Sequence, residues 1–487
     1  MNTETVLGHI LPVIQAILKD VVDQMSTTSA APTLYDLEAQ TQAALPRIGQ
    51  AILQGAVEGQ GSGVEGPLRS CPCGQEQGYH DQARPLTVQT SVGDIRLKQR
   101  AYYHCRACGA NGYPLDERLG LGHAGRMSRY LQEQCGWLLA LLPARVAQQT
   151  LHRFGWPAIS ASLIREHGEA LGAELEQQEQ EAQAVARAEA ATTPAHQLPP
   201  RQAAQSQRLY AAPDGVMYCT TERDPETKQM RWRELKVAAV YEAEAAAQPE
   251  PPPVRARIQA WIRQEHPEAD LPGPDQAKRV SYVAQTGPWD QFGQRLWAEL
   301  WARGLGRPVR EVVVVADGAD HIDHVVESEL RLPHLHLTRI LDIAHAQQHL
   351  WAVSKAAFGD GSAAGLAWVQ GPLTALERGA VGEVMNCLEA LAAEREQGAP
   401  AVAEVARKAG AYFRQRQAQV DYPRFVAAGY QIGSGLAESA CKRFGTDRMK
   451  GAGMRWTVPG AQCVATLRLF VLSERWAEVT SHCRQAA

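Results

Sequence analysis

The order of apolar segments from Leu209 onward constrains the fold more than any other feature of this sequence. A segment rich in Trp and Leu, Trp289 to Trp301, has helical spacing and precedes the last of several short β-branched runs. These runs predict strands at about 209–213, 234–241, 279–284 and 311–316. Helical segments follow the fourth run. Three strands, a helix, a fourth strand and further helices are the chain order of an RNase H-like mixed sheet.

Four of the ten cysteines form two pairs that bracket a predicted β-hairpin. Cys71-Pro-Cys73 and Cys105-Arg-Ala-Cys108 are each followed by glycine, which permits a tight turn. Zinc prefers four soft ligands in a tetrahedron, so the set predicts a structural Zn²⁺ site whose four positions are all filled by the protein. The first pair is one residue shorter than the usual C-x-x-C, and His80 or His104 is an alternative for one thiolate.

The remaining segments predict a multidomain α+β chain. Residues 144–150 and 160–171, on either side of Phe154-Gly-Trp-Pro157, have the spacing of a helix-turn-helix, with Ser160 as the N-cap of the second helix. We divide the chain into an N-terminal helical region (1–66), a zinc-ribbon-like hairpin (67–120), a helix-turn-helix region (121–190), a linker (191–208), the first part of an RNase H-like core (209–350), a helical insertion (351–430) and the last part of the core (431–487).

Two aspartates follow predicted strands, and each precedes a glycine. Asp214 follows Leu209-Tyr-Ala-Ala-Pro, and Asp317 follows Glu311-Val-Val-Val-Val-Ala, the most continuous strand of the sequence. A single Asp-Gly most often marks a turn. Two of them, at the ends of the first and fourth strands of one sheet, indicate carboxylates that hold divalent cations. Two such ions roughly 3.5–4 Å apart stabilise the attacking and leaving oxygens in phosphoryl transfer.

The C-terminal segment from Gly433 to Trp456 places an acidic residue before a basic cluster. Glu438 falls in the first turn of a predicted helix that opens with Gly-Ser-Gly. Lys442 lies four residues after Glu438, a spacing that also fits an ordinary exposed ion pair on one helix face. In a chain of formal net charge −4, so much local basic charge favours a surface that binds the DNA backbone. The expected DNA-binding residues are Lys442, Arg443, Arg448, Lys450, Arg455 and Trp456.

Taken together, these motifs resemble insertion-sequence transposases of the ISKra group, from about residue 68 to 475. The resemblance rests on the cysteine hairpin with its continuation to Leu121, on Asp214-Gly, on Asp317-Gly-Ala and on Leu341-Asp-Ile-Ala-His345. Its most specific part is Arg448-Met-Lys-Gly-Ala-Gly-Met-Arg-Trp456. The chain has Asp214-Gly-Val where the family usually has Asp-Gly-Thr.

The resemblance implies a DNA transposase of the DDE type, in which Asp214, Asp317 and Glu438 hold Mg²⁺ or Mn²⁺ on an RNase H-like core with a helical insertion. Related Mutator-like transposases carry a Cys/Asp-x-x-His signature between the second Asp and the Glu, and Asp342-Ile-Ala-His345 is similar to it. Asp342 is therefore an alternative second member of the triad. We favour Asp317 because it ends the more continuous strand.

The resemblance also implies partners and a location. The protein is expected to bind terminal inverted repeats and target DNA, and to act as a homodimer or larger assembly on DNA. No segment approaches the ~18 apolar residues that span a membrane, and the N-terminus lacks the basic region of a secretory signal. We expect a bacterial cytoplasmic, nucleoid-associated protein. The alternatives are a catalytically inactive, transposase-derived DNA-binding regulator and an RNase H-like nuclease without strand transfer.

Overall fold

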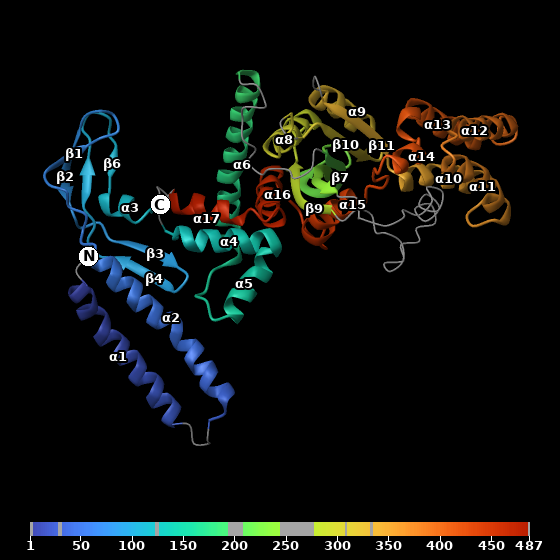
Figure 1. Ribbon diagram of the computed structural model, residues 1–487. Coiled ribbons are helices and arrows are strands. Elements are labelled where there is room, and N and C mark those ends of the chain that lie inside the picture. The colour runs from blue at the N-terminus through green and yellow to red at the C-terminus, as the bar shows by residue number, and fades with distance from the viewer. Residues whose placement is uncertain are drawn as a thin grey trace. The chain divides into compact units, whose positions relative to one another are not determined.

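The computed structural model describes residues 3–27, 32–121, 126–192, 208–243, 277–306, 309–331 and 335–485. The chain divides into two compact units, Met1–Glu176 with Thr466–Ala487, and Gln177–Ala465 (Figure 1). This division differs from the predicted last core segment, 431–487, because the residues from Thr466 onward group with the N-terminal unit. Among the described helices, none is both long and apolar enough to cross a membrane.

The N-terminal unit begins with two helices that pack against each other, α1 (Thr3–Thr27) and α2 (Leu34–Glu58). A capping box starts α2: the Thr33 hydroxyl accepts the backbone N–H of Asp36, and the Asp36 carboxylate accepts that of Thr33. The predicted helical region 1–66 is thus helical over most of its length.

Short strands follow these helices and form two small sheets. The first is antiparallel and has the order β1 (Leu68–Ser70), β2 (Glu76–Asp81), β5 (Tyr102–His104) and β6 (Asn111–Gly112). The second is a hairpin of β3 (Leu86–Thr90) and β4 (Gly93–Leu97), whose apolar side chains pack with α2 and with Leu115 of α3 (Pro114–Arg118). Residues 95–103 therefore contribute to two strands, β4 and β5, which belong to different sheets.

The helix-turn-helix segment is present as α5 (Ala144–Arg153) and α6 (Ala161–Thr192), preceded by α4 (Arg129–Leu141). The Ser160 hydroxyl accepts the backbone N–H of Leu163 at 3.2 Å, which confirms Ser160 as the cap of α6. Leu131, Ala147 and Ile164 share one small core. The helix α17 (Trp476–Gln485) packs on α4. Most of the predicted linker, residues 193–207, lies outside the described residues.

The second unit is built around a five-stranded mixed sheet in the order β11-β10-β7-β8-β9. Strands β7, β10 and β11 are parallel, whereas β8 is antiparallel to both of its neighbours. The five strands are β7 (Arg208–Arg223), β8 (Met230–Ala243), β9 (Ala277–Gln285), β10 (Glu311–Ala316) and β11 (His336–Leu341). All four predicted strands are present. The fifth, β11, was missed because this edge strand is half exposed and lacks a continuous apolar run.

The two faces of this sheet carry different elements, because successive strand residues point to opposite sides. Leu209, Ala211 and Val312 lie on one face and share a core with α8 (Trp289–Ala302), α9 (Asp320–Val325) and the π-helical turn η2 (Val326–Leu330). The opposite face carries Asp214. It is covered by α15 (Gly435–Cys441) and the π-helical segment η4 (Lys442–Met449), which precede α16 (Val458–Leu472).

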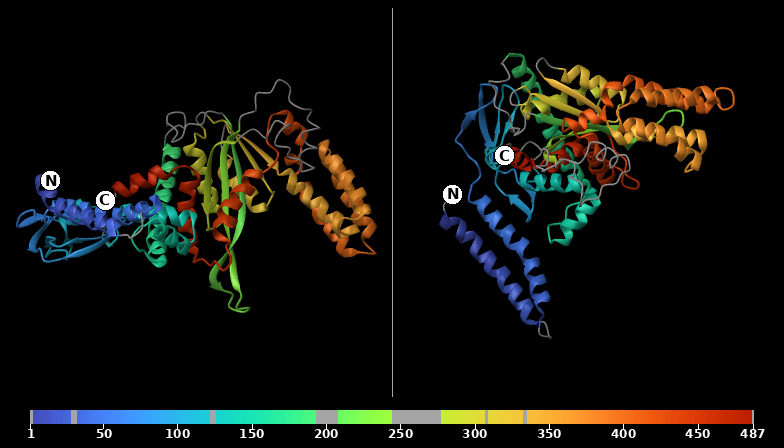
Figure 2. Two further views of the ribbon diagram at one scale, coloured as in Figure 1. Left: turned by 90° about the horizontal axis from the view of Figure 1, so that it is seen from below. Right: turned by 45° about the vertical axis from the view of Figure 1, so that its right-hand side comes forward.

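Helices occupy most of the chain between β11 and α15, as the predicted insertion at 351–430 requires. They are α10 (Ile343–Phe358), α11 (Ala363–Glu377), α12 (Val381–Arg395), α13 (Pro400–Gln415), the short 3-10 turn η3 (Gln417–Gln419) and α14 (Tyr422–Ala427). Figure 2 shows α10–α13 as one group that extends away from the sheet. The insertion therefore begins with α10, directly after β11.

Candidate functional site

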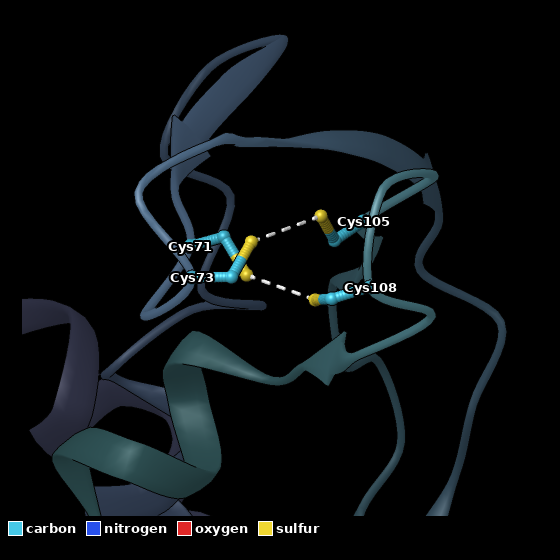
Figure 3. Close-up of side chains that lie close together, drawn as sticks. All are labelled: Cys71, Cys73, Cys105 and Cys108. Carbon is cyan, nitrogen blue, oxygen red and sulfur yellow. Dashed lines mark hydrogen bonds between the residues drawn. The ribbon is translucent and has the colours of Figure 1, made fainter.

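The four predicted cysteine ligands converge on one point in the N-terminal unit. Their sulfur atoms all lie within 4.8 Å of one another, with Cys71 and Cys108 3.6 Å apart and Cys73 and Cys105 3.7 Å apart (Figure 3). Each pair sits in a turn that closes through a glycine with positive φ, Gly74 (84°) or Gly109 (76°). The short C-x-C pair thus reaches the same point as the longer C-x-x-C pair.

The cluster fits a zinc ion. Four thiolates at ~2.3 Å from a tetrahedral Zn²⁺ would place their sulfurs about 3.8 Å apart, close to the separations seen. Backbone N–H groups of Cys108 and Ala107, of which that of Cys108 has the largest effect, lower the pKa of Cys105 to about 6 against an opposing effect of burial. At Cys73 the Gln75 backbone has the largest single effect and lowers the pKa, but the neighbouring thiols outweigh it and raise the pKa of Cys73 to about 12. Cys105 therefore reaches the thiolate form that binds metal more readily than Cys73. His80 and His104 bind Asp81 and Asn111 instead, so neither replaces a cysteine.

Three aspartates lie just beyond the paired residues of the parallel strands β7, β10 and β11. The register pairs Ala211 of β7 with Val314 of β10, and Ala316 of β10 with Leu341 of β11. Asp214 lies three residues beyond the last β7–β10 pair, whereas Asp317 and Asp342 directly follow the last β10–β11 pair, and Asp317 is near enough to Asp214 to raise its pKa. The structure therefore brings Asp214 and Asp317 together, with Asp342 as the third member of the row.

Asp214 does not end its strand, contrary to the prediction. The ladder between β7 and β8 continues through Asp214, opposite Val237, and on to the end of β7 at Arg223. The turn expected at Gly215 is absent because Gly215 pairs with Lys236, and its missing side chain leaves room for the Glu234 carboxylate. Asp214 is consequently held by a rigid central strand rather than by a loop.

The environment of Asp214 favours binding of a cation. Burial, the largest influence, raises the pKa of this carboxyl, and the neighbouring Asp317 raises it further. The Cys441 thiol, which donates to Asp214 Oδ2 at 3.1 Å, the Gly215 N–H and His345 oppose the rise. A divalent cation would relieve the repulsion between two carboxylates at this depth. The oxygen donors also suit Mg²⁺ or Mn²⁺.

Asp317 lies in a turn directly after β10. Its Oδ1 accepts the backbone N–H of Ala319 at 2.9 Å, and Gly318 adopts a φ of 77°, a conformation that suits glycine. Tyr412 of α13 donates its hydroxyl to the backbone carbonyl of Asp317 at 2.5 Å. The predicted turn at Asp317-Gly318 is therefore present, and the insertion contacts it.

Asp342 is bound by backbone donors and serves as a cap. Its carboxylate accepts the N–H of His345 at the start of α10 and the N–H of Ser434, which immediately precedes α15. Burial alone would raise the pKa of Asp342, but these hydrogen bonds and that of the His345 ring outweigh it and hold the pKa below its usual value. Both carboxylate oxygens of Asp342 thus accept backbone N–H groups, whereas Asp317 accepts one at Oδ1.

Glu438 lies in the first turn of α15, on the side of the sheet that carries Asp214. It is exposed and stands one helical turn before Cys441, whose thiol reaches Asp214. Among the described residues, only the four thiols form a set of three or more candidate ligands that all lie within 4.8 Å. Glu438 thus lies on the expected side of the sheet, but the carboxylate oxygens of Asp214, Asp317 and Glu438 do not all lie within 4.8 Å of one another.

The predicted basic surface is only partly exposed. Lys442, Arg443, Lys450 and Arg455 are exposed, whereas Arg448 is 2% exposed, with its guanidinium 4.9 Å from the ring centroid of Trp456. Backbone hydrogen bonds between Trp456 and residues 219 and 221 fasten this segment to β7. Arg448 is thus buried and Trp456 half-buried, because the segment pairs with β7 at residues 219 to 221.

Several residues near the carboxylates were not predicted. Cys441 binds Asp214, Tyr412 binds the backbone of Asp317, and His349 stacks on Tyr412 with ring centroids 3.9 Å apart. His345, which was predicted, lies close enough to Asp317 and Asp214 for both to raise its pKa, after the larger effect of the Asp342 hydrogen bond. The spacing of His345 and His349 on one helix face was the one available signal for the second histidine.

Comparison with known proteins gives no assignment. No protein-family model matches the chain, and no curated protein matches it. Function must therefore be argued from the sites themselves.

Proposed function

We propose that the chain is a DDE-type DNA transposase of an insertion sequence, similar to the ISKra group, with an RNase H-like catalytic core. The observation that carries this proposal is that Asp214 of β7 and Asp317, directly after the adjacent parallel strand β10, lie close enough for Asp317 to raise the pKa of Asp214. Two further features support it. The order β9-β8-β7-β10-β11, with only β8 reversed, matches the order expected of an RNase H-like sheet, and α15 carries Glu438 on the side of the sheet that carries Asp214.

In this proposal Asp214, Asp317 and Glu438 hold the catalytic metal. Mg²⁺ or Mn²⁺, when bound, supplies an activated water and neutralises charge on the reacting phosphate. The protein contributes position: Asp214 is fixed by a central strand, Asp317 by the turn after β10, and Glu438 by α15. The same site would cut DNA at the ends of the element and then direct the freed 3′-OH onto target DNA.

The other parts of the chain would bind DNA. Exposed Lys442, Arg443, Lys450 and Arg455 lie on the elements that follow Glu438 and would hold phosphates near the cut. The thiol cluster, with structural Zn²⁺, and the α5–α6 helix-turn-helix would bind the terminal inverted repeats. Because two ends are cut in one reaction, we propose a homodimer or larger assembly on DNA, at the nucleoid of a bacterial cell.

A cleavage and strand-transfer assay tests this proposal. The DNA substrate carries the ends that flank the gene, and the reaction contains Mg²⁺ or Mn²⁺. We expect metal-dependent cuts at these ends that are lost in Asp317→Asn and Glu438→Gln and retained in Asp447→Asn, an exposed acid on η4. Cutting that survives both triad substitutions contradicts the assignment. Cutting without joining to a target indicates a nuclease instead.

One observation favours the second candidate, a catalytically inactive DNA-binding regulator derived from a transposase. The exposed Glu438 does not join the two aspartates in a close ligand set, whereas the helix-turn-helix and thiol cluster are well formed. Tight binding to the element ends, with no cutting in either metal, would select this candidate.

A further inference from the structure

Three side chains of the helical insertion meet at the turn that carries Asp317. They are His349 of α10, Tyr412 of α13 and Arg416, which directly follows α13. We call these three residues the insertion clamp. The Tyr412 ring stacks on His349, with centroids 3.9 Å apart and planes inclined by 29°. The Arg416 guanidinium also lies 4.5 Å from the Tyr412 ring centroid. The ring of Tyr412 thus contacts both partners.

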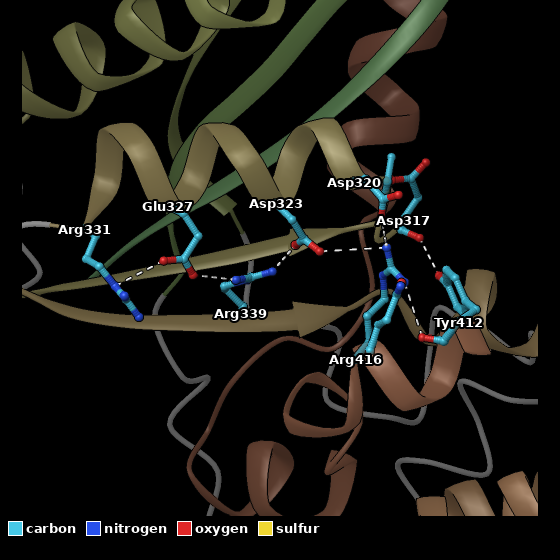
Figure 4. Close-up of polar contacts among 10 residues, drawn as sticks. Asp317, Asp320, Asp323, Glu327, Arg331, Arg339, Tyr412 and Arg416 are labelled. Carbon is cyan, nitrogen blue, oxygen red and sulfur yellow. Dashed lines mark hydrogen bonds and ion pairs between the residues drawn. The ribbon is translucent and has the colours of Figure 1, made fainter. Parts of the chain in front are cut away.

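The Tyr412 hydroxyl extends from this stack to the backbone of the turn. It donates to the carbonyl oxygen of Asp317 at 2.5 Å (Figure 4). Because the bond is to the backbone, it fixes where the Asp317 side chain begins and leaves the carboxylate available as a ligand. The carboxylate keeps its own bond to the Ala319 N–H. The hydroxyl therefore restrains the position of Asp317 without competing for metal.

Arg416 holds the other side of the same turn. Its side chain is only 4% exposed, and its guanidinium pairs with Asp320 at 2.6 Å and with Asp323 at 3.8 Å, both on α9. Its Nε lies 2.7 Å from the point that a Cβ on Gly318 would occupy. The guanidinium therefore packs directly against the Gly318 backbone. A buried cation paired in this way fixes the geometry of its neighbours strongly.

The ion pairs continue from this point along the sheet edge. Asp323 also binds Arg339 of β11, and Arg339 pairs with Glu327 at 2.7 Å (Figure 4). The turn is thus tied to α9 and β11 as well as to α13. Tyr412 lies 95 residues after Asp317, and Arg416 lies 96 residues after Asp320. Residues distant in sequence thus fix the position of the Asp317 carboxylate.

We propose that the insertion clamp positions Asp317 for metal binding, with Tyr412 as the positioning residue. This inference rests on the proposed function, because it takes Asp317 as a metal ligand. It assigns the insertion a defined task in the active site, beyond that of a spacer between β11 and α15. Loss of the Tyr412 hydroxyl should release the turn and weaken metal binding, while the ring and its stack with His349 remain.

The chain offers a matched control. Tyr422 of α14 donates its hydroxyl to the backbone carbonyl of Leu341 at 3.2 Å, at the end of the neighbouring strand β11. The residue after Leu341 is Asp342, which caps α10 and is not a proposed ligand. Tyr412→Phe and Tyr422→Phe therefore remove the same kind of bond from adjacent strand ends. Only Tyr412→Phe removes it from a metal-binding position.

The test is titration of full-length protein with Mn²⁺, followed by water-proton relaxation, with Asp317→Asn to identify the signal from this site. We expect Tyr412→Phe to weaken Mn²⁺ binding about three- to tenfold, the range for loss of one hydrogen bond, and Tyr422→Phe to leave it unchanged. Hydrogen exchange at the Gly318 and Ala319 amides should accelerate in Tyr412→Phe alone.

Each other outcome has a distinct meaning. If wild-type protein binds Mn²⁺ in an Asp317-dependent way and Tyr412→Phe binds it equally well, the clamp proposal is overturned while the metal site stands. Equal weakening by both substitutions also overturns it, because the effect is then a general loss of stability. If wild-type protein shows no Asp317-dependent binding, the proposed metal site fails and the clamp proposal fails with it.

Discussion

The burial of Arg448 separates it from the exposed residues of the basic cluster, which the proposed function assigns to DNA contacts. Lys442, Lys450 and Arg455 are exposed, whereas Arg448 is packed beside Trp456. Each phosphate contact contributes about 0.9 to the slope of log affinity against log salt concentration. Replacing the three exposed residues with alanine should therefore reduce this slope by up to ~2.7. Arg448→Ala should leave the slope unchanged.

The same substitution should reveal Arg448 as a structural residue. Loss of a desolvated cation–π contact costs about 2 kcal/mol, so Arg448→Ala should lower the melting temperature, which the triple variant should preserve. Fluorescence anisotropy with labelled element-end DNA at several salt concentrations gives the slope, and thermal unfolding gives the stability. A reduced salt slope in Arg448→Ala, together with an unchanged slope in the triple variant, would refute the assignment of Arg448 to the protein interior and of the other three residues to DNA contacts.

Three further predictions concern the two candidate metal sites. Purified protein should contain one Zn²⁺ per chain by elemental analysis, and Cys73→Ser should lose it, because the tetrahedral set would keep only three thiolates. In protein free of Mg²⁺ and Mn²⁺, the raised pKa of Asp214 means that the folded state holds its proton more tightly than the unfolded state. The stability that this proton confers is present at low pH and is lost as pH rises through the raised pKa; Asp214→Asn should remove this part of the pH dependence of the melting temperature. Asp342→Asn should cost about 2–3 kcal/mol in a denaturant titration because it weakens two backbone caps, whereas Asp317→Asn should cost less than about 1 kcal/mol.

A strand of the second unit could be predicted where both of its faces are buried, because such a strand is a continuous run of apolar residues. The run Val312 to Val315 is buried throughout and reads as a central strand from composition alone. The strand β7 was predicted to end at Pro213, because Asp214-Gly215 has the composition of a turn. Pairing with β8 instead continues the strand through Asp214 and Gly215 to Arg223. The sequence around Asp214 does not show which residues of another strand will pair with it.

The candidate ligands were predictable, but their supporting contacts were not. Asp317 follows an obvious strand, whereas Tyr412 contacts it from 95 residues further along the chain. Cys441 reaches Asp214 across 227 residues. A tyrosine or cysteine in a helical segment carries no local sign of such a contact. The burial of Arg448 was hidden for a similar reason, since it depends on where Trp456 docks on β7.

Asp342 explains how a long insertion is compatible with a fixed position for the candidate metal ligands. One carboxylate accepts N–H groups from His345 and from Ser434, which lie at the two ends of the insertion. The backbone N–H of Ile343 also binds the carbonyl of Ile432 at 3.1 Å. The chain therefore leaves the sheet and returns to it at one point, directly before α15. The helix α15, which carries Glu438, thus begins beside the end of β11 whatever the length of the insertion between them.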